Sequence, residues 1–137
     1  MARFVALIDG KVGAYGAVFP DAPGCNAMGE TMDEALRNAA EALSEWVADE
    51  VADGRGTPVA RSLEVLLRDA AVIETMQETG AVPTLIPLVL NSGRPARANV
   101  SLDAGLLQAI DEAAKRMGLT RSAFLATAAR EKIAAGA

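Results

Sequence analysis

The 137-residue chain contains no histidine, although it has 31 charged side chains of other kinds, 13 Lys/Arg and 18 Asp/Glu. Imidazole is the commonest general base near neutral pH, so serine and cysteine nucleophiles lack their usual partner here. The single cysteine, Cys25, cannot form an internal disulfide, which indicates a reducing compartment. No apolar run approaches the roughly 20 residues needed to cross a bilayer, and no signal-peptide pattern opens the chain. We therefore expect a cytoplasmic protein without membrane contact.

The net charge of −5 conceals an uneven distribution of charge along the chain. Residues 1–90 hold 6 Lys/Arg against 14 Asp/Glu, a net charge of −8, whereas residues 91–137 hold 7 against 4, a net charge of +3. An acidic body joined to a basic module favours two partners of opposite charge. We expect one domain at residues 1–90, a linker at 91–93, where Asn-Ser-Gly stands, and a second domain at 94–137.

The acidic body has the strand pattern of a small sheet. Four stretches have strand character: residues 2–10, 12–19, 25–28 and 83–90. Asp9-Gly10 is a strong tight-turn signal, so the first two stretches should pair as a hairpin around it. Pro87 cannot donate a hydrogen bond to a neighbouring strand, which predicts an edge position or only partial pairing for the last stretch.

Two helical patterns lie between the third and fourth stretches. Thr31 and Glu34 form a capping box, and apolar residues follow at helical spacing until Asp53-Gly54. A second pattern starts at Leu63 and reaches Gly80 in one or two pieces. The predicted fold class of the whole chain is α+β.

Three motifs in this body resemble the N-terminal domain of HicB antitoxins. They are FPDAPGC at residues 19–25, GET at 29–31 and EAL at 34–36. The resemblance implies a partial ribonuclease-H-like N-terminal domain followed by a DNA-binding module. It also implies a HicA-type partner, a small basic ribonuclease toxin that cleaves messenger RNA and is inhibited when the antitoxin covers its active site. Such inhibition requires no catalytic residue, metal or cofactor from the antitoxin, and we expect none.

The basic module begins with an alternating stretch, residues 97–101, which has no strand partner nearby in its own chain. A second copy of the stretch would satisfy its backbone groups and form a two-stranded ribbon of the width that enters the DNA major groove. This arrangement resembles a ribbon-helix-helix module. Arg97, Asn99 and Ser101 share the face expected to read base edges, because Arg suits guanine and Asn suits adenine.

Two helical patterns joined at Gly118 complete the module. Thr120 is the expected N-cap of the second helix, where Thr120, Arg121 and Ser122 should bind a DNA phosphate. So small a module cannot bury a core alone, so we expect a homodimer or homotetramer. The residues expected in the dimer core are Ala98, Val100, Leu102, Leu106, Ile110 and Phe124.

Three alternatives remain open from the sequence. Two helices joined at a glycine also suit a helix-turn-helix, although the strand before them favours the ribbon form. A stand-alone regulator would use the body to sense a ligand or only to oligomerise. A metal-dependent nuclease would need clustered carboxylates, for which Asp9, Asp21, Glu30 and Asp33 are available.

Overall fold

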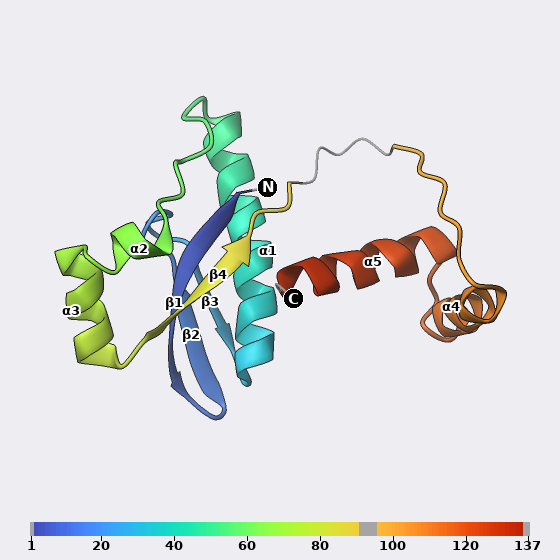
Figure 1. The fold of residues 1–137 in the computed structure, drawn as a ribbon, viewed down its shortest axis with the longest axis horizontal. Helices are drawn as coiled ribbons and strands as arrows, with labels where there is room; N and C mark the ends of the chain where they lie inside the picture. The colour runs from blue at the N-terminus through green and yellow to red at the C-terminus, as the bar shows by residue number, and fades with distance from the viewer. Residues whose placement is uncertain (1, 91–95, 136–137) are drawn as a thin grey trace.

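The computed structural model describes residues 2–90 and 96–135, which form an α+β arrangement (Figure 1). Within these residues a four-stranded antiparallel sheet has the order β3-β2-β1-β4. The strands are β1 (Arg3–Lys11), β2 (Ala14–Val18), β3 (Asn26–Gly29) and β4 (Val82–Pro87). The helices are α1 (Met32–Ala52), α2 (Leu63–Leu66), α3 (Ala70–Thr79), α4 (Ala104–Arg116) and α5 (Arg121–Ala134). No helix in the described ranges is long and apolar enough to cross a membrane.

Strand β1 lies at the centre of the hydrophobic core, and its residues from Phe4 to Ile8 are buried without interruption. Successive side chains of a strand point to opposite faces, so both faces of β1 must be covered. Phe4 belongs to the cluster beneath α1, whereas Val5 and Leu7 belong to a second cluster with residues of α2 and α3. Figure 1 shows α1 on one side of the sheet and α2 and α3 on the other.

Helix α1 covers its face of the sheet with four fully buried residues at a spacing of four: Ala35, Ala39, Leu43 and Val47. The predicted N-cap is confirmed, because the Thr31 hydroxyl accepts a hydrogen bond from the Glu34 amide at 3.1 Å. The Glu34 carboxylate accepts from the amide of Glu30 at 3.4 Å, not from that of Thr31. The helix gives way to Asp53 and Gly54, as the sequence predicts.

The first hairpin turns three residues later than the sequence suggested. Asp9 and Gly10 lie inside β1, and the register that pairs Lys11 with Ala14 leaves Val12 and Gly13 as the loop. The prediction of a turn at Asp9-Gly10 was therefore wrong. The later turn pairs Ile8 with Ala17, which keeps both residues in the core beneath α1. Burial across the two strands thus outweighs the local preference of an Asp-Gly pair.

Strand β4 occupies the edge of the sheet, as predicted from its proline. The Leu88 amide donates to the Ala2 carbonyl at 2.9 Å, so even-numbered amides of this stretch face β1. Pro83 and Pro87 consequently stand where an amide would point away from the sheet. The prolines therefore lack an amide only on the free edge of the sheet, and no hydrogen bond to β1 is lost.

The other predicted elements of the body differ only at their boundaries. The third strand starts at Asn26, one residue later than expected, and the second helical pattern forms two pieces, α2 and α3. Residues 96–103 form neither helix nor strand in the single chain, so the predicted strand at 97–101 stays a prediction. The expected linker at 91–93 lies outside the described residues.

Gly29 sets how closely α1 approaches the sheet. A Cβ atom at Gly29 would lie 2.4 Å from the Ala35 amide nitrogen, a distance that backbone atoms cannot tolerate. We expect Gly29→Ala to lower the free energy of unfolding by about 1–3 kcal/mol through overpacking. Urea denaturation measures this change.

Gly16→Ala is the matched control, because a Cβ there would meet Asp9 Oδ1 at 3.4 Å and needs at most a slight side-chain adjustment. Equal destabilisation by the two substitutions would show that close approach to α1 is not the cause.

Candidate functional site

Helices α4 and α5 form a capped pair at the C-terminal end of the chain. The Asp103 carboxylate accepts hydrogen bonds from the amides of Gly105 at 3.0 Å and Leu106 at 3.2 Å, and so begins α4. Gly118, with φ +68°, follows α4, and the Thr120 hydroxyl accepts from the Ala123 amide at 3.1 Å to begin α5. The predicted junction at Gly118 and the predicted N-cap Thr120 are confirmed.

The residues predicted for the dimer core are only partly buried in the single chain. Ile110 is 7% exposed, Leu102 and Phe124 are half-buried, and Ala98 is exposed. Val100 and Leu106 are 66% and 50% exposed. A single chain therefore leaves part of its apolar set in contact with water, as a module that requires a partner would.

The three residues predicted to read bases stand on the segment that leads into α4. Arg97, Asn99 and Ser101 are all exposed and belong to residues 96–103, which form neither helix nor strand. Figure 1 places this segment beside α4, far from the sheet. The three side chains are accessible to a partner, and their role remains a prediction.

At the predicted phosphate site, the Arg121 side chain is already engaged in an ion pair, whereas backbone amides point outward from the helix. Arg121 donates from Nε to Asp111 Oδ1 and from Nη2 to Asp111 Oδ2, both at 2.8 Å. This two-point ion pair lowers the pKa of Asp111 and raises that of Arg121, chiefly through the hydrogen bonds. The Thr120 hydroxyl accepts the hydrogen bond of the Ala123 amide. The amides of Arg121 and the exposed Ser122 therefore point outward from the N-terminus of α5.

A second charged cluster ties the body together and was not predicted from the sequence. Asp21, whose side chain is 8% exposed, accepts from the Arg61 amide at 2.8 Å and from Arg61 Nε at 2.7 Å. Arg61 Nη1 also lies 3.1 Å from Asp69 Oδ2. Hydrogen bonds from the Val72 amide and from Arg61 lower the pKa of Asp69. Asp21 belongs to the FPDAPGC motif, so this motif anchors its loop to the segment that carries α2 and α3.

The carboxylates considered for a nuclease are not gathered together. Asp21 is bound by Arg61, while Glu30 and Asp33 are exposed. Among residues 2–90 and 96–135, no group of three or more His, Cys, Asp or Glu side chains could hold a metal ion. Cys25 is buried, and burial raises the pKa of its thiol, which makes it a poor nucleophile.

The sheet body and the capped helix pair define a small α+β protein. A family model described as the HicB-like antitoxin of bacterial toxin–antitoxin systems matches residues 4–129. The chain therefore belongs to the HicB-like antitoxin family. The resemblance found in the three motifs of the body is confirmed.

Solved structures and a curated protein are also similar to this chain. The crystal structure of the Burkholderia pseudomallei antitoxin HicB has 31% identity to this chain and a TM-score of 0.56, covering 97% of this chain and 99% of that one. A chain of the HicA3 and HicB3 toxin-antitoxin complex has 20% identity and a TM-score of 0.54, covering 64% of this chain and 99% of that one, a likeness of fold. An uncharacterized 14.9 kDa protein from the rep-hol intergenic region of Haemophilus phage HP1 (strain HP1c1) is 28% identical over 100 residues, 72% of this chain and 71% of that protein.

The ion pair between α4 and α5 should make stability depend on pH. Because Arg121 lowers the pKa of Asp111 below its ordinary 3.8, the pair contributes stability above that pH. This contribution is lost as the pH falls through the lowered value. We expect Asp111→Asn to reduce the melting temperature at pH 7 and to flatten its decline below pH 4, measured by circular dichroism.

Glu112→Gln is the control for this prediction, because the neighbouring carboxylate bonds only the uncharged Gln108 among the contacts described, at 3.2 Å. The same pH profile in both variants would contradict a stabilising role for the ion pair.

Proposed function

We propose that this chain is an antitoxin that binds and inhibits a HicA-type messenger-RNA-cleaving ribonuclease and represses its own operon by binding an operator. The observation that carries the proposal is the family match over residues 4–129, which spans both the sheet body and the α4–α5 pair. The uneven charge supports two partners, since the net charge is −8 over residues 1–90 and +3 over residues 91–137.

The sheet body, proposed to be a partial ribonuclease-H-like domain, is the part assigned to the toxin. Helix α1 carries six acidic residues and one basic residue, and Glu41, Glu45 and Asp49 are exposed. Such a surface accelerates association with a basic protein and disfavours acidic ones. Inhibition by coverage needs only that surface. The similar fold in the HicA3 and HicB3 toxin-antitoxin complex supports a toxin partner of the same kind for this chain.

The α4–α5 pair is the part assigned to DNA, as a ribbon-helix-helix module. In the proposed dimer, residues 97–101 of two copies pair as antiparallel strands and enter the major groove with Arg97, Asn99 and Ser101. The amides of Arg121 and Ser122 bind a backbone phosphate at the N-terminus of α5. The exposed Val100 and Leu106 become covered by the second copy. Two such dimers in a tetramer would read repeated half-sites.

The DNA assignment predicts separable effects of single substitutions. Arg97→Ala and Asn99→Ala should each weaken operator binding by about 1–3 kcal/mol, because each removes a bidentate contact to a base. Fluorescence anisotropy with promoter DNA at fixed salt measures the affinity, and sedimentation tests whether the dimer survives.

Arg68→Ala is the charge-matched control, since Arg68 is exposed in the turn between α2 and α3. If Arg97→Ala, Asn99→Ala and Arg68→Ala all leave operator affinity unchanged, residues 97–101 do not form the reading face.

The toxin assignment predicts that residues 1–90 suffice for neutralisation. This fragment retains β4, the bond from Leu88 to Ala2, and the bond from Ser44 Oγ to the Val89 carbonyl at 2.7 Å. We expect it to suppress RNA cleavage by the product of the adjacent gene while losing all operator binding. A fragment with a folded circular dichroism spectrum that fails to neutralise would contradict this division.

If the product of the adjacent gene is no ribonuclease and is not retained by this protein, the antitoxin proposal itself fails.

A further inference from the structure

The C-terminal end of α5 lies against the sheet body, where it contacts α1 and β4 (Figure 1). A groove of about 540 Å³ runs along this contact. Its lining residues come from α1, from β4 and the residues after it, and from α5. Those of α5 are Thr127, Arg130 and Glu131. Positions three and four residues apart share one helix face, so α5 presents a single face to the body.

The sequence of α1 explains why α5 can approach there. Ala40, Ser44 and Ala48 follow one another at a spacing of four and line the groove with small side chains. Ser44 Oγ donates to the Val89 carbonyl at 2.7 Å, so the Ser44 hydroxyl bonds the segment after β4 and not α5. The middle of the α1 face therefore has no bulky group that would hold α5 away.

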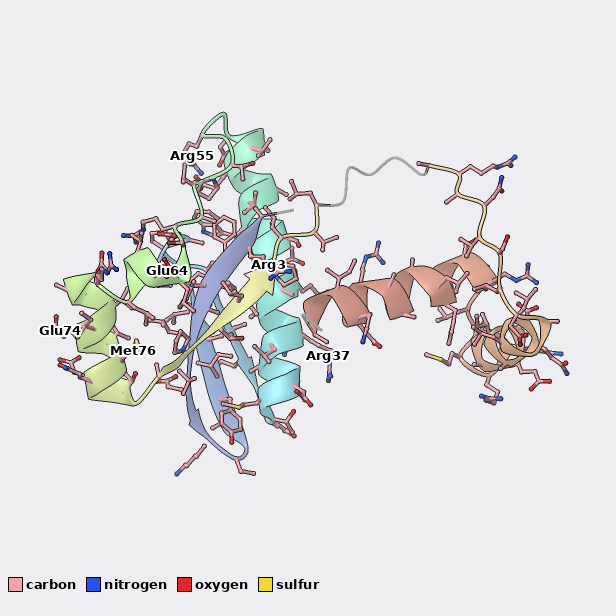
Figure 2. All side chains as sticks on the ribbon, in the orientation of Figure 1. Arg3, Arg37, Arg55, Glu64, Glu74 and Met76 are labelled. Carbon is pink, nitrogen blue, oxygen red and sulfur yellow. The ribbon has the colours of Figure 1, made fainter. Side chains whose placement is uncertain are left out.

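Charged side chains of both signs border this small-residue stripe. Arg37, Glu41 and Glu45 of α1 line the groove together with Arg130 and Glu131 of α5. Figure 2 shows Arg37 on the side of α1 that faces the end of α5. The border of this contact is therefore charged, as in contacts between parts of a chain that can separate.

The direction of α5 determines what this contact does. Its 14 residues span about 20 Å, with the C-terminal end on α1 and the N-terminal end at α4 and the segment 96–103. We propose that the stripe of Ala40, Ser44 and Ala48 is a seat for α5 that holds the acidic body away from operator DNA. This inference rests on the DNA binding proposed above.

The electrostatic reason is the range over which exposed charges repel one another. The Debye length is about 8 Å at physiological salt, so a separation of roughly 20 Å screens the net −8 of residues 1–90 from DNA phosphates. A body released from the seat can approach within one Debye length and repel the operator. Seating thus favours DNA binding without adding a contact to DNA.

Three substitutions in the full-length chain test the seat. Ser44→Arg places a long side chain in the middle of the stripe, whereas Ser44→Ala removes the same hydroxyl and keeps the stripe small. Ala71→Arg adds the same positive charge at an exposed position of α3, on the opposite side of the sheet. Small-angle scattering measures the radius of gyration, and anisotropy measures operator affinity between low and physiological salt.

We expect Ser44→Arg alone to expand the molecule and to weaken operator binding at low salt by at least about fivefold, with the loss shrinking as salt rises. This direction is opposite to that of an added positive charge, which strengthens DNA binding in Ala71→Arg. If the wild type binds the operator but Ser44→Arg matches Ser44→Ala in size or in affinity, the seat is overturned and the proposed function stands. If the wild type does not bind, the operator-binding part of the proposed function fails and the inference falls with it.

Discussion

Burial of β1 on both faces is the constraint on which the rest of the body depends. Five consecutive residues, from Phe4 to Ile8, are withdrawn from water, and no single helix can cover both sides of a strand. One face requires α1, and the other requires α2 and α3, which arrive only after a long connection from α1. The Asp21–Arg61 ion pair fixes that connection to the loop between β2 and β3, so the two layers are held in register by a contact between residues 40 positions apart.

The caps and helix boundaries could be predicted from the sequence because their determinants are local. Thr31, Asp103 and Thr120 each bond an amide within three residues, so the chain adjacent to them decides the outcome. The first turn was misplaced because Asp9-Gly10 and Val12-Gly13 are both possible turns. Which of the two forms depends on which residues of β2 join the core. Register is a property of two strands together, and a local turn signal cannot report it.

The contacts of charged side chains were the least predictable part of the candidate site. Arg121 was expected to meet a phosphate, but its guanidinium lies in a two-point bond with Asp111, ten residues earlier on the preceding helix. Whether those two residues meet depends on the angle between α4 and α5, which no spacing rule supplies. The alternating segment at 97–101 raises a different difficulty. A strand requires a hydrogen-bonded neighbour. The structure of a single chain therefore cannot show a strand that forms only by pairing with a second chain.

Inhibition by coverage, as proposed for this chain, would place its function in surfaces, and this changes what the structure must control. Catalytic groups must be positioned to fractions of an ångström. In the proposed arrangement, the requirement is instead that two surfaces of opposite charge stay apart. In this chain an acidic body and a basic helix pair belong to one polypeptide, and each is a potential competitor for the other's partner. Separation by the length of one helix is sufficient, because screened repulsion falls off over a shorter distance than α5 spans. In the proposed arrangement the small side chains of Ala40, Ser44 and Ala48 matter as much as any charged residue, because they let the C-terminal end of α5 lie close to α1.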